Sequence, residues 1–140
     1  MSLESVFPAL ANDGYTITSP QAQEYNCVAW AAGASDVWWD PAIGYFWPDD
    51  APREHGIDAL KAAFASLGYV ECDNEQPETG FEKIALYAQQ DEWTHAARLL
   101  PNGNWTSKLG PQEDIEHGSP VGLAGTAYGK VACIMKRPIQ

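Results

Sequence analysis

The first regular pattern of apolar and polar positions along the chain is helical. Residues 21–32 (QAQEYNCVAWAA) carry apolar side chains at helical spacing, and the pattern stops at Gly33, a typical residue just beyond a helix C-terminus. Two residues are suitable N-caps. If Ser19 caps the helix, Cys27 lies inside it, whereas a cap at Asn26 makes Cys27 the first helical residue.

A second helix is predicted over residues 52–67, and it ends at Gly68. Its apolar residues recur at i, i+3, i+7 and i+10 and form one stripe, made of Ile57, Leu60, Phe64 and Leu67. The preceding residues 37–52 are rich in aromatic side chains and are interrupted by prolines. We expect them to form a loop that is packed by its own rings.

Strand patterns dominate the second half of the chain. Residues 69–72, 83–89 and 129–136 have strand composition, and residues 73–80 have the polar composition of a loop. Residues 94–100 and 105–109 flank a Pro-Asn-Gly sequence, which is typical of a hairpin with a left-handed glycine.

The three-residue hairpin loop places Leu99 opposite Trp105. In this register His95, Ala97, Trp105 and Ser107 share one face, while a two-residue turn would place Lys108 there instead. Because helices precede strands, we expect an α+β fold in which N-terminal helices pack on a C-terminal antiparallel β-sheet. The 140 residues (15.3 kDa) are enough for a single domain, residues 1–140.

Charge restricts the classes of partner. The chain has 19 acidic and 8 basic residues, a net charge of −11, which argues against nucleic acid and anionic membranes as ligands. Residues 1–92 hold 16 of the acidic residues and 3 of the basic ones. We see no membrane span and no signal peptide, and we therefore expect a cytoplasmic location.

The 3 cysteines include no CxxC pair, so neither a disulfide framework nor a cysteine-rich zinc site is expected. A metal site would have to combine His95 and His117 with Asp114 or Glu116. We prefer a helical turn for residues 113–117, and we expect no metal and no cofactor. His55 is expected to be a solvated surface residue.

One pair of residues has the layout of a thiol site. Cys27 lies in a short helix, and His95 opens a hairpin about 70 residues later. A helix N-terminus and a nearby imidazole lower the pKa of a thiol, and a third polar group on the next strand orients the imidazole. Ser107 and Asn104 are candidates for that third group.

Several segments resemble an uncharacterised bacterial family of small proteins. The motifs are YNCxAWA, THAARxL and WTSKLGxxEDIEH, which this chain carries at residues 25–31, 94–100 and 105–117. The layout of that family is similar to papain-like cysteine hydrolases of the NlpC/P60, CHAP and transglutaminase-like kind. The resemblance implies a papain-like architecture and cleavage or transfer at an amide, isopeptide or thioester bond of a peptide or small-molecule substrate.

The same resemblance implies roles for individual residues. Cys27 would be the nucleophile and His95 the base, while Ser107 departs from the Asn, Asp, His or Gln usual at the third position. The backbone N–H of Cys27 would form the oxyanion hole, together with a side chain from Gln21, Gln23 or Asn26. Candidate substrate contacts are the aromatic rings of Trp30, Trp38 and Trp39 and the cations of Arg98 and Lys108, which suit a substrate carboxylate.

An alternative comes from the acidity of the chain. A small, tryptophan-rich domain of net charge −11 also suits a binding protein for a basic protein partner, of the immunity-protein or inhibitor type. In that case Cys27 and His95 are core residues, and the acidic residues 36–92 form the binding face. A catalytically inactive papain-like domain lies between the two hypotheses.

Overall fold

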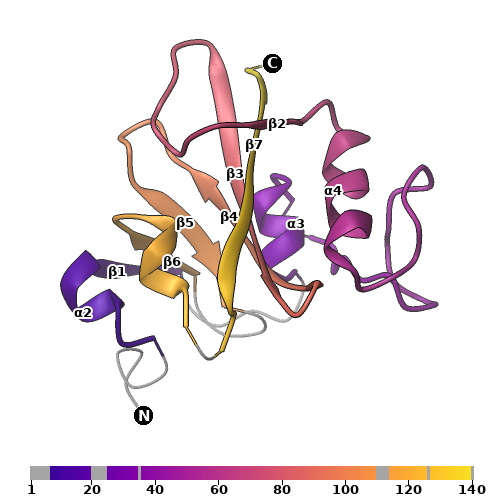
Figure 1. Ribbon diagram of the computed structural model, residues 1–140, viewed down its shortest axis with the longest axis horizontal. Helices are drawn as coiled ribbons and strands as arrows, with labels where there is room; N and C mark the ends of the chain where they lie inside the picture. Colours follow the sequence, from indigo (N-terminus) through magenta and orange to yellow (C-terminus); the bar gives the residue numbers. More distant parts are fainter. Residues whose placement is uncertain (1–6, 20–24, 35, 110–113, 126, 140) are drawn as a thin grey trace.

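The main feature of the computed structural model is an antiparallel sheet of seven strands (Figure 1). The structure describes residues 7–19, 25–34, 36–109, 114–125 and 127–139. Across the sheet the strand order is β1-β6-β5-β4-β3-β7-β2. In chain order the strands are β1 (Tyr15–Ser19), β2 (Val70–Cys72), β3 (Phe81–Gln89), β4 (Glu92–Leu99), β5 (Trp105–Lys108), β6 (Asp114–His117) and β7 (Lys130–Pro138).

The helices of the described residues are short. They are α2 (Leu10–Asp13), α3 (Cys27–Ala31), α4 (Ile57–Ala65) and the 3₁₀ helix η1 (Pro120–Leu123). The expected α+β fold, with helices packed on a sheet as in papain-like enzymes, is therefore wrong, and the protein is largely β. The physical reason is that β1 and β6 hold only 5 and 4 residues, too few for alternation to reveal them in the sequence.

The predicted helices are present in shortened form. Helix α3 begins at Cys27, because the side-chain oxygen of Asn26 accepts a hydrogen bond from the backbone N–H of Ala29 (3.2 Å). This confirms the second of the two candidate caps, and residues 20–24 lie outside the described residues. Helix α4 starts after Gly56 and is 9 residues long, so the prediction of a helix from residue 52 was too long.

The hairpin register is confirmed by the structure. Leu99 pairs with Trp105, and Arg98 pairs with Thr106. Gly103 has φ of 91°, a left-handed value that glycine adopts without a steric penalty. The residues that were expected on one face of the hairpin therefore share that face.

Residues 114–117 do not form the expected helical turn. They form β6, which pairs with β5 on one side and with β1 on the other. In this strand Ile115 and His117 alternate with Asp114 and Glu116, so the two acids and the histidine point to opposite faces of the sheet.

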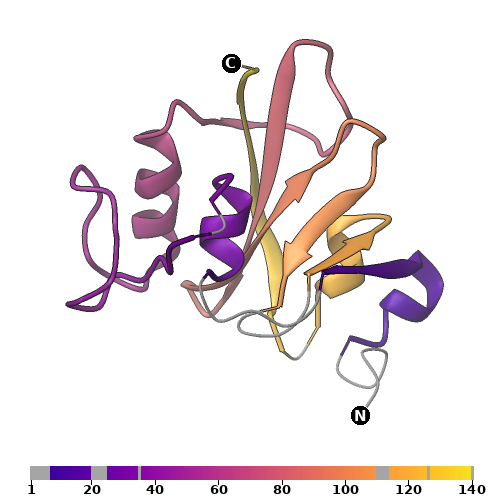
Figure 2. The ribbon, with the colours of Figure 1, turned by 180° about the vertical axis from the view of Figure 1, so that it is seen from behind.

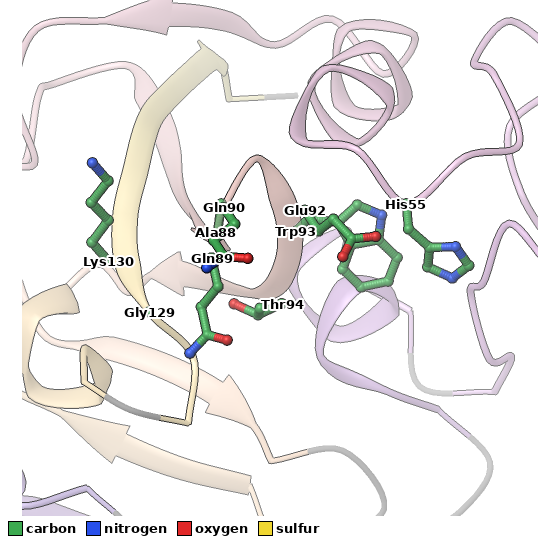
Figure 3. A pocket seen from close by; sticks show the side chains of 9 residues that line it. All are labelled: His55, Ala88, Gln89, Gln90, Glu92, Trp93, Thr94, Gly129 and Lys130. Atoms are coloured by element: carbon green, nitrogen blue, oxygen red, sulfur yellow. The ribbon is translucent and has the colours of Figure 1, made fainter.

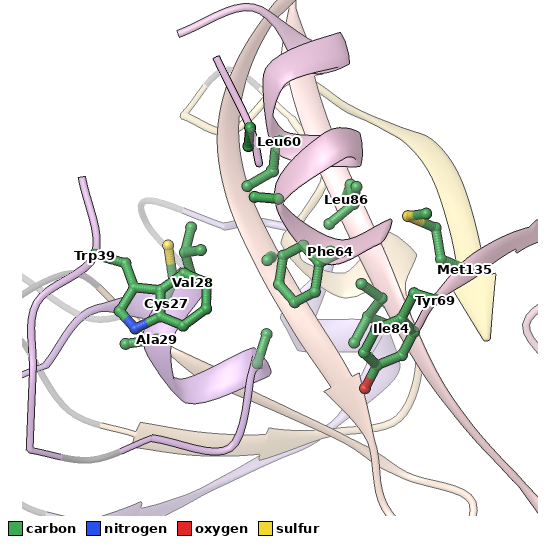
Figure 4. Packing of buried hydrophobic residues seen from close by; sticks show 14 of the residues in the cluster. Cys27, Val28, Ala29, Trp39, Leu60, Phe64, Tyr69, Ile84, Leu86 and Met135 are labelled. Atoms are coloured by element: carbon green, nitrogen blue, oxygen red, sulfur yellow. The ribbon is translucent and has the colours of Figure 1, made fainter. Parts of the chain in front are cut away.

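Each face of the sheet carries its own hydrophobic core. On the first, which we call the α3 face, residues of α3 and α4 pack over Ile84, Leu86, Ala96 and Met135 (Figure 4). On the second, which we call the η1 face, residues of α2 and η1 pack over alternate strand positions, including Ala85, Tyr87, Ala97, Trp105 and Ile115. The two views of the ribbon show α3 and α4 on the same side of the sheet, away from α2 and η1 (Figures 1 and 2).

Candidate functional site

Cys27 is the first residue of α3, and its side chain is buried in the core of the α3 face. Only 7% of the residue is exposed. Burial raises the pKa of the thiol to about 11, since a charged sulfur would lose its hydration. Backbone hydrogen bonds from Ala96, Val28 and Cys27 itself, and the charge of Lys108, lower the pKa but do not offset burial.

His95 lies within β4 and is completely buried. Its ring stacks on Tyr128 with the centroids 4.2 Å apart, and it meets the edge of Tyr87 at 5.0 Å. Neither ring nitrogen has a hydrogen-bond partner among the described residues. Burial, assisted by the nearby charge of His117, holds the pKa of His95 well below its ordinary value of 6.5.

The thiol and the imidazole occupy opposite faces of the sheet. Ala96 belongs to the same core as Cys27, while Tyr87, which contacts His95, belongs to the core of the η1 face. Successive side chains of a strand point in opposite directions, so His95 points away from the face that holds Cys27. Tyr128 lies near both Cys27 and His95. Its ring stacks on His95, and a charge on Cys27 raises the pKa of its phenol. The structure shows no hydrogen bond between Cys27 and His95.

Ser107 shares the face of His95, but its hydrogen bond goes to another histidine. The Ser107 hydroxyl lies 2.8 Å from Nε2 of His117, and Nδ1 of His117 lies 2.8 Å from the carbonyl oxygen of Ser119. A carbonyl only accepts, so Nδ1 carries the proton and the neutral ring accepts the hydroxyl of Ser107 at Nε2. Burial lowers the pKa of His117, although the Ser119 carbonyl and the charge of Asp13 oppose the effect.

This serine–histidine pair was missed in the sequence, and it is anchored from a distant segment. Asp13 accepts hydrogen bonds from the backbone N–H of Ser119 (2.7 Å) and from its hydroxyl (2.9 Å). The sequence carried no clear signal for this pair, because β6 holds only 4 residues, too few for alternation to indicate a strand. Ser107 and His117 are both buried, so the pair is closed to solvent in this structure.

Lys108 and Asn104 have structural partners of their own. Lys108 is buried on the α3 face, where its ammonium lies over the ring of Tyr25 at 5.1 Å. The Tyr25 hydroxyl donates to Oδ2 of Asp114 (2.6 Å), the residue that pairs with Lys108 across β5 and β6. Asn104 donates to the carboxylate of Glu116 (2.7 Å).

The predicted substrate-binding residues are distributed over the α3 face and the neighbouring loop. The guanidinium of Arg98 lies over the ring of Trp30 at 5.0 Å, and Nε1 of Trp30 donates to the Thr106 hydroxyl (3.0 Å). Trp39 is buried and Trp38 is partly exposed. The aromatic rings therefore pack within the structure rather than lining one cleft above Cys27.

The proposed oxyanion-hole side chains have different outcomes. Asn26 is fully engaged in the fold: its amide nitrogen donates to the Trp39 carbonyl (2.6 Å), and its oxygen accepts from the backbone N–H groups of Trp39 and Ala29. Gln21 and Gln23 lie outside the described residues.

No set of three or more His, Cys, Asp or Glu side chains within the described part of the chain is arranged to hold a metal ion. The set considered above is divided between the two faces of the sheet, because His95 and His117 point away from Asp114 and Glu116.

The larger of two described cavities, about 720 Å³, lies beside the β3–β4 hairpin (Figure 3). Its walls combine the ring of Trp93 with the polar side chains of His55, Gln89, Glu92 and Lys130. The second, about 620 Å³, lies where β3 and β4 separate and includes Arg98. Neither Cys27 nor His95 lines either cavity.

Comparison with known proteins places the chain in a family. Residues 16–136 match a domain of unknown function (DUF7689), and the chain therefore belongs to that family. No curated protein and no solved structure matches the chain. Within the described residues, no helix has both the length and the apolar character needed to cross a bilayer.

Proposed function

We propose that this protein binds a basic protein partner, in the manner of an immunity protein or an inhibitor. The observation that carries the proposal is the separation of Cys27 from His95 by the sheet, combined with a net charge of −11. A cysteine hydrolase needs a thiol and a base within hydrogen-bond reach. In this chain each of these groups is buried in a core of its own.

The protonation states support the same proposal. A thiol whose burial raises its pKa to about 11 is uncharged at neutral pH, and a histidine whose pKa is held well below 6.5 is uncharged as well. An activated cysteine site has the reverse arrangement, a thiolate beside an imidazolium. Both residues therefore behave as core side chains.

The experiment is a pull-down followed by reconstitution from purified components. We expect a partner with an excess of Lys and Arg, and an affinity that falls steeply with added salt because opposite charges attract over long range. The Cys27→Ala variant should bind as well as the unmodified chain. A partner whose binding requires the Cys27 thiol, or one that binds independently of salt, would contradict the proposal.

A cysteine hydrolase is the second candidate, and one observation favours it. Cys27 is the first residue of a helix, and the backbone of Ala96, Val28 and Cys27 itself offers hydrogen bonds to the sulfur. Such groups also stabilise an oxyanion. Turnover of a peptide or thioester substrate that Cys27→Ala abolishes would establish this candidate.

We also propose a cytoplasmic location. The cysteines of the described residues, Cys27, Cys72 and Cys133, are all free thiols, which suits a reducing compartment. Fractionation of cells that express the chain with a C-terminal tag tests this location, and recovery outside the cytoplasm would contradict it.

A further inference from the structure

We infer that the loop of residues 40–50 is the docking surface for a segment of the partner that carries both cationic and apolar side chains. This inference rests on the proposed function, and it adds the site and the chemistry of the segment bound. In both ribbon views this loop projects beyond α4, at the side of the molecule opposite α2 (Figures 1 and 2).

Three large apolar residues at the loop tip are exposed to solvent. Ile43 is 96% exposed, Tyr45 is 50% exposed and Phe46 is 48% exposed. Single exposed apolar residues are common on protein surfaces, but a group of them within four positions is typical of an interaction site. The two tryptophans that flank this tip pack inward: Trp39 and Trp47 are buried.

The loop has a defined shape that holds these side chains outward. The backbone N–H of Asp40 donates to the carbonyl of Phe46 (3.0 Å), and the rings of Trp39 and Phe46 lie 4.8 Å apart. Gly44, with φ of 99°, permits the left-handed turn between Ile43 and Tyr45. A preformed surface loses little conformational entropy on binding.

Arg53 stabilises the loop from within. Its guanidinium donates to the carbonyl oxygens of Pro41, Ala42 and Tyr45 at 3.2–3.4 Å. The only basic residue between positions 36 and 58 is therefore directed at the backbone of the loop itself, where it neutralises no carboxylate.

The acids around the loop are left uncompensated. Residues 36–58 contain six acidic residues. One of them, Asp40, has its Oδ1 atom 3.7 Å from Nε2 of His55. The other five accept no hydrogen bond and form no ion pair with any described residue; they are Asp36, Asp49, Asp50, Glu54 and Asp58. An exposed apolar tip inside such a field is complementary to a segment that presents Lys or Arg around an apolar side chain.

The same field argues against other occupants. A second copy of the chain would bring the same negative charge to the contact, and like charges oppose such an interface. An anionic lipid surface would be repelled for the same reason.

The larger cavity adjoins this loop through His55, which lies near Asp40 and stacks on Trp93 at 5.7 Å between ring centroids. Glu92 lies beside the same rings (Figure 3). A carboxylate next to an aromatic face is a suitable place for one cationic side chain of the partner.

The test measures the affinity of fluorescent peptides by anisotropy. The main probe alternates lysine and leucine, and two control peptides replace either all leucines by serine or all lysines by glutamate. The unmodified chain should bind the lysine–leucine peptide at least about tenfold more tightly than either control peptide. Equal binding of the glutamate–leucine peptide would overturn the inference.

The loop variant is Ile43→Ser/Tyr45→Ser/Phe46→Ser, and we expect it to lose about tenfold or more in affinity for the lysine–leucine peptide. Since Phe46 also packs on Trp39, the double variant Ile43→Ser/Tyr45→Ser provides a version that spares the loop core. The matched control is Val70→Ser/Val121→Ser/Ile139→Ser, whose residues are 59%, 57% and 62% exposed outside the loop. The control variant should retain its affinity.

The outcomes separate the two proposals. If the unmodified chain binds neither cationic peptide, the proposed function fails together with this inference. If it binds but both loop variants bind equally well, or the control variant loses as much affinity, the docking surface is wrong while the proposed function stands. A dimer that the loop variants convert to a monomer would make a second copy the occupant and would also overturn the inference.

Discussion

Along β4, β5 and β6 the two faces of the sheet bury polar groups of different kinds. On the α3 face the buried polar groups include charged side chains, with Lys108 over the ring of Tyr25 and Asp114 bonded to its hydroxyl. On the η1 face of these three strands the buried polar groups are uncharged, with His117 bonded to Ser107 and His95 between aromatic rings.

This difference shows that the even or odd position of a residue along its strand decides which face its side chain occupies, and so which side chains can react together. Helix α3 packs over even-numbered positions, Ala96 in β4 and Thr106 in β5. His95 and Ser107 are odd-numbered and project to the other side. A thiol on α3 would need its base at an even-numbered position of these strands.

The largest expected effect is on the reactivity of Cys27. A pKa raised from 9.0 to about 11 leaves about 100-fold less thiolate at a given pH, so iodoacetamide should alkylate Cys27 about 100-fold more slowly than an unperturbed thiol. Mass spectrometry of tryptic peptides measures the rate, with the unfolded chain in guanidinium as the control. Rapid alkylation of Cys27 at pH 6 would instead indicate an activated site.

Lowering the pH should destabilise the protein mainly through the buried histidines of the η1 face. Burial lowers the pKa of both His95 and His117, so below about pH 6.5 the unfolded state takes up protons that the folded state does not. The contribution of the two neutral imidazoles to the free energy of unfolding is complete above that pH and is lost as the pH falls below it. Urea unfolding between pH 7 and pH 5 measures the loss, above the range in which carboxylates titrate. A midpoint that does not change over this interval would show that neither imidazole is buried.

Removing the imidazole of His117 should destabilise the fold by about 2–3 kcal/mol, because His117→Leu leaves the buried hydroxyl of Ser107 and the carbonyl of Ser119 without their partner. Urea unfolding at pH 7 measures the change. In the Ser107→Ala background the same substitution should lower the free energy of unfolding by less, since the buried hydroxyl of Ser107 is already absent. Equal costs in the two backgrounds would argue against the hydrogen bond between Ser107 and His117.

The smallest effect has the opposite sign. His95→Leu should stabilise the protein by about 1 kcal/mol, because it replaces by apolar atoms two buried ring nitrogens that have no hydrogen-bond partner among the described residues. It should also reduce the loss of stability between pH 7 and pH 5. A large destabilisation would mean that the imidazole has a role that its described contacts do not reveal.

Local features were predictable from the sequence wherever a few neighbouring residues determine them. Asn26, one of two candidate helix caps, and Gly103 in the hairpin are of this kind, and the three-residue hairpin loop correctly predicted that His95 and Ser107 share a face. The helix over residues 52–67 was too long because its stripe shows which residues pack together but not where the helix begins.

The partnership of Ser107 with His117 depends on contacts between distant segments. It requires β6 to pair with β5, and it requires Asp13 to fix Ser119 from 106 residues away. Neither β1 nor β6 is long enough to show its own pattern in the sequence. These two strands extend the sheet to seven strands, and the fold is therefore largely β rather than the expected α+β.

The sequence by itself determined the charge of this protein, the hairpin, the candidate cap at Asn26 and the aromatic loop, since these follow from composition and from contacts between near neighbours. Only the tertiary structure decided the face on which each polar side chain is buried, because that depends on how α3 and β6 dock on the sheet. This docking placed Cys27 and His95 on opposite sides, and it left the acids and the apolar tip of residues 36–58 directed at solvent.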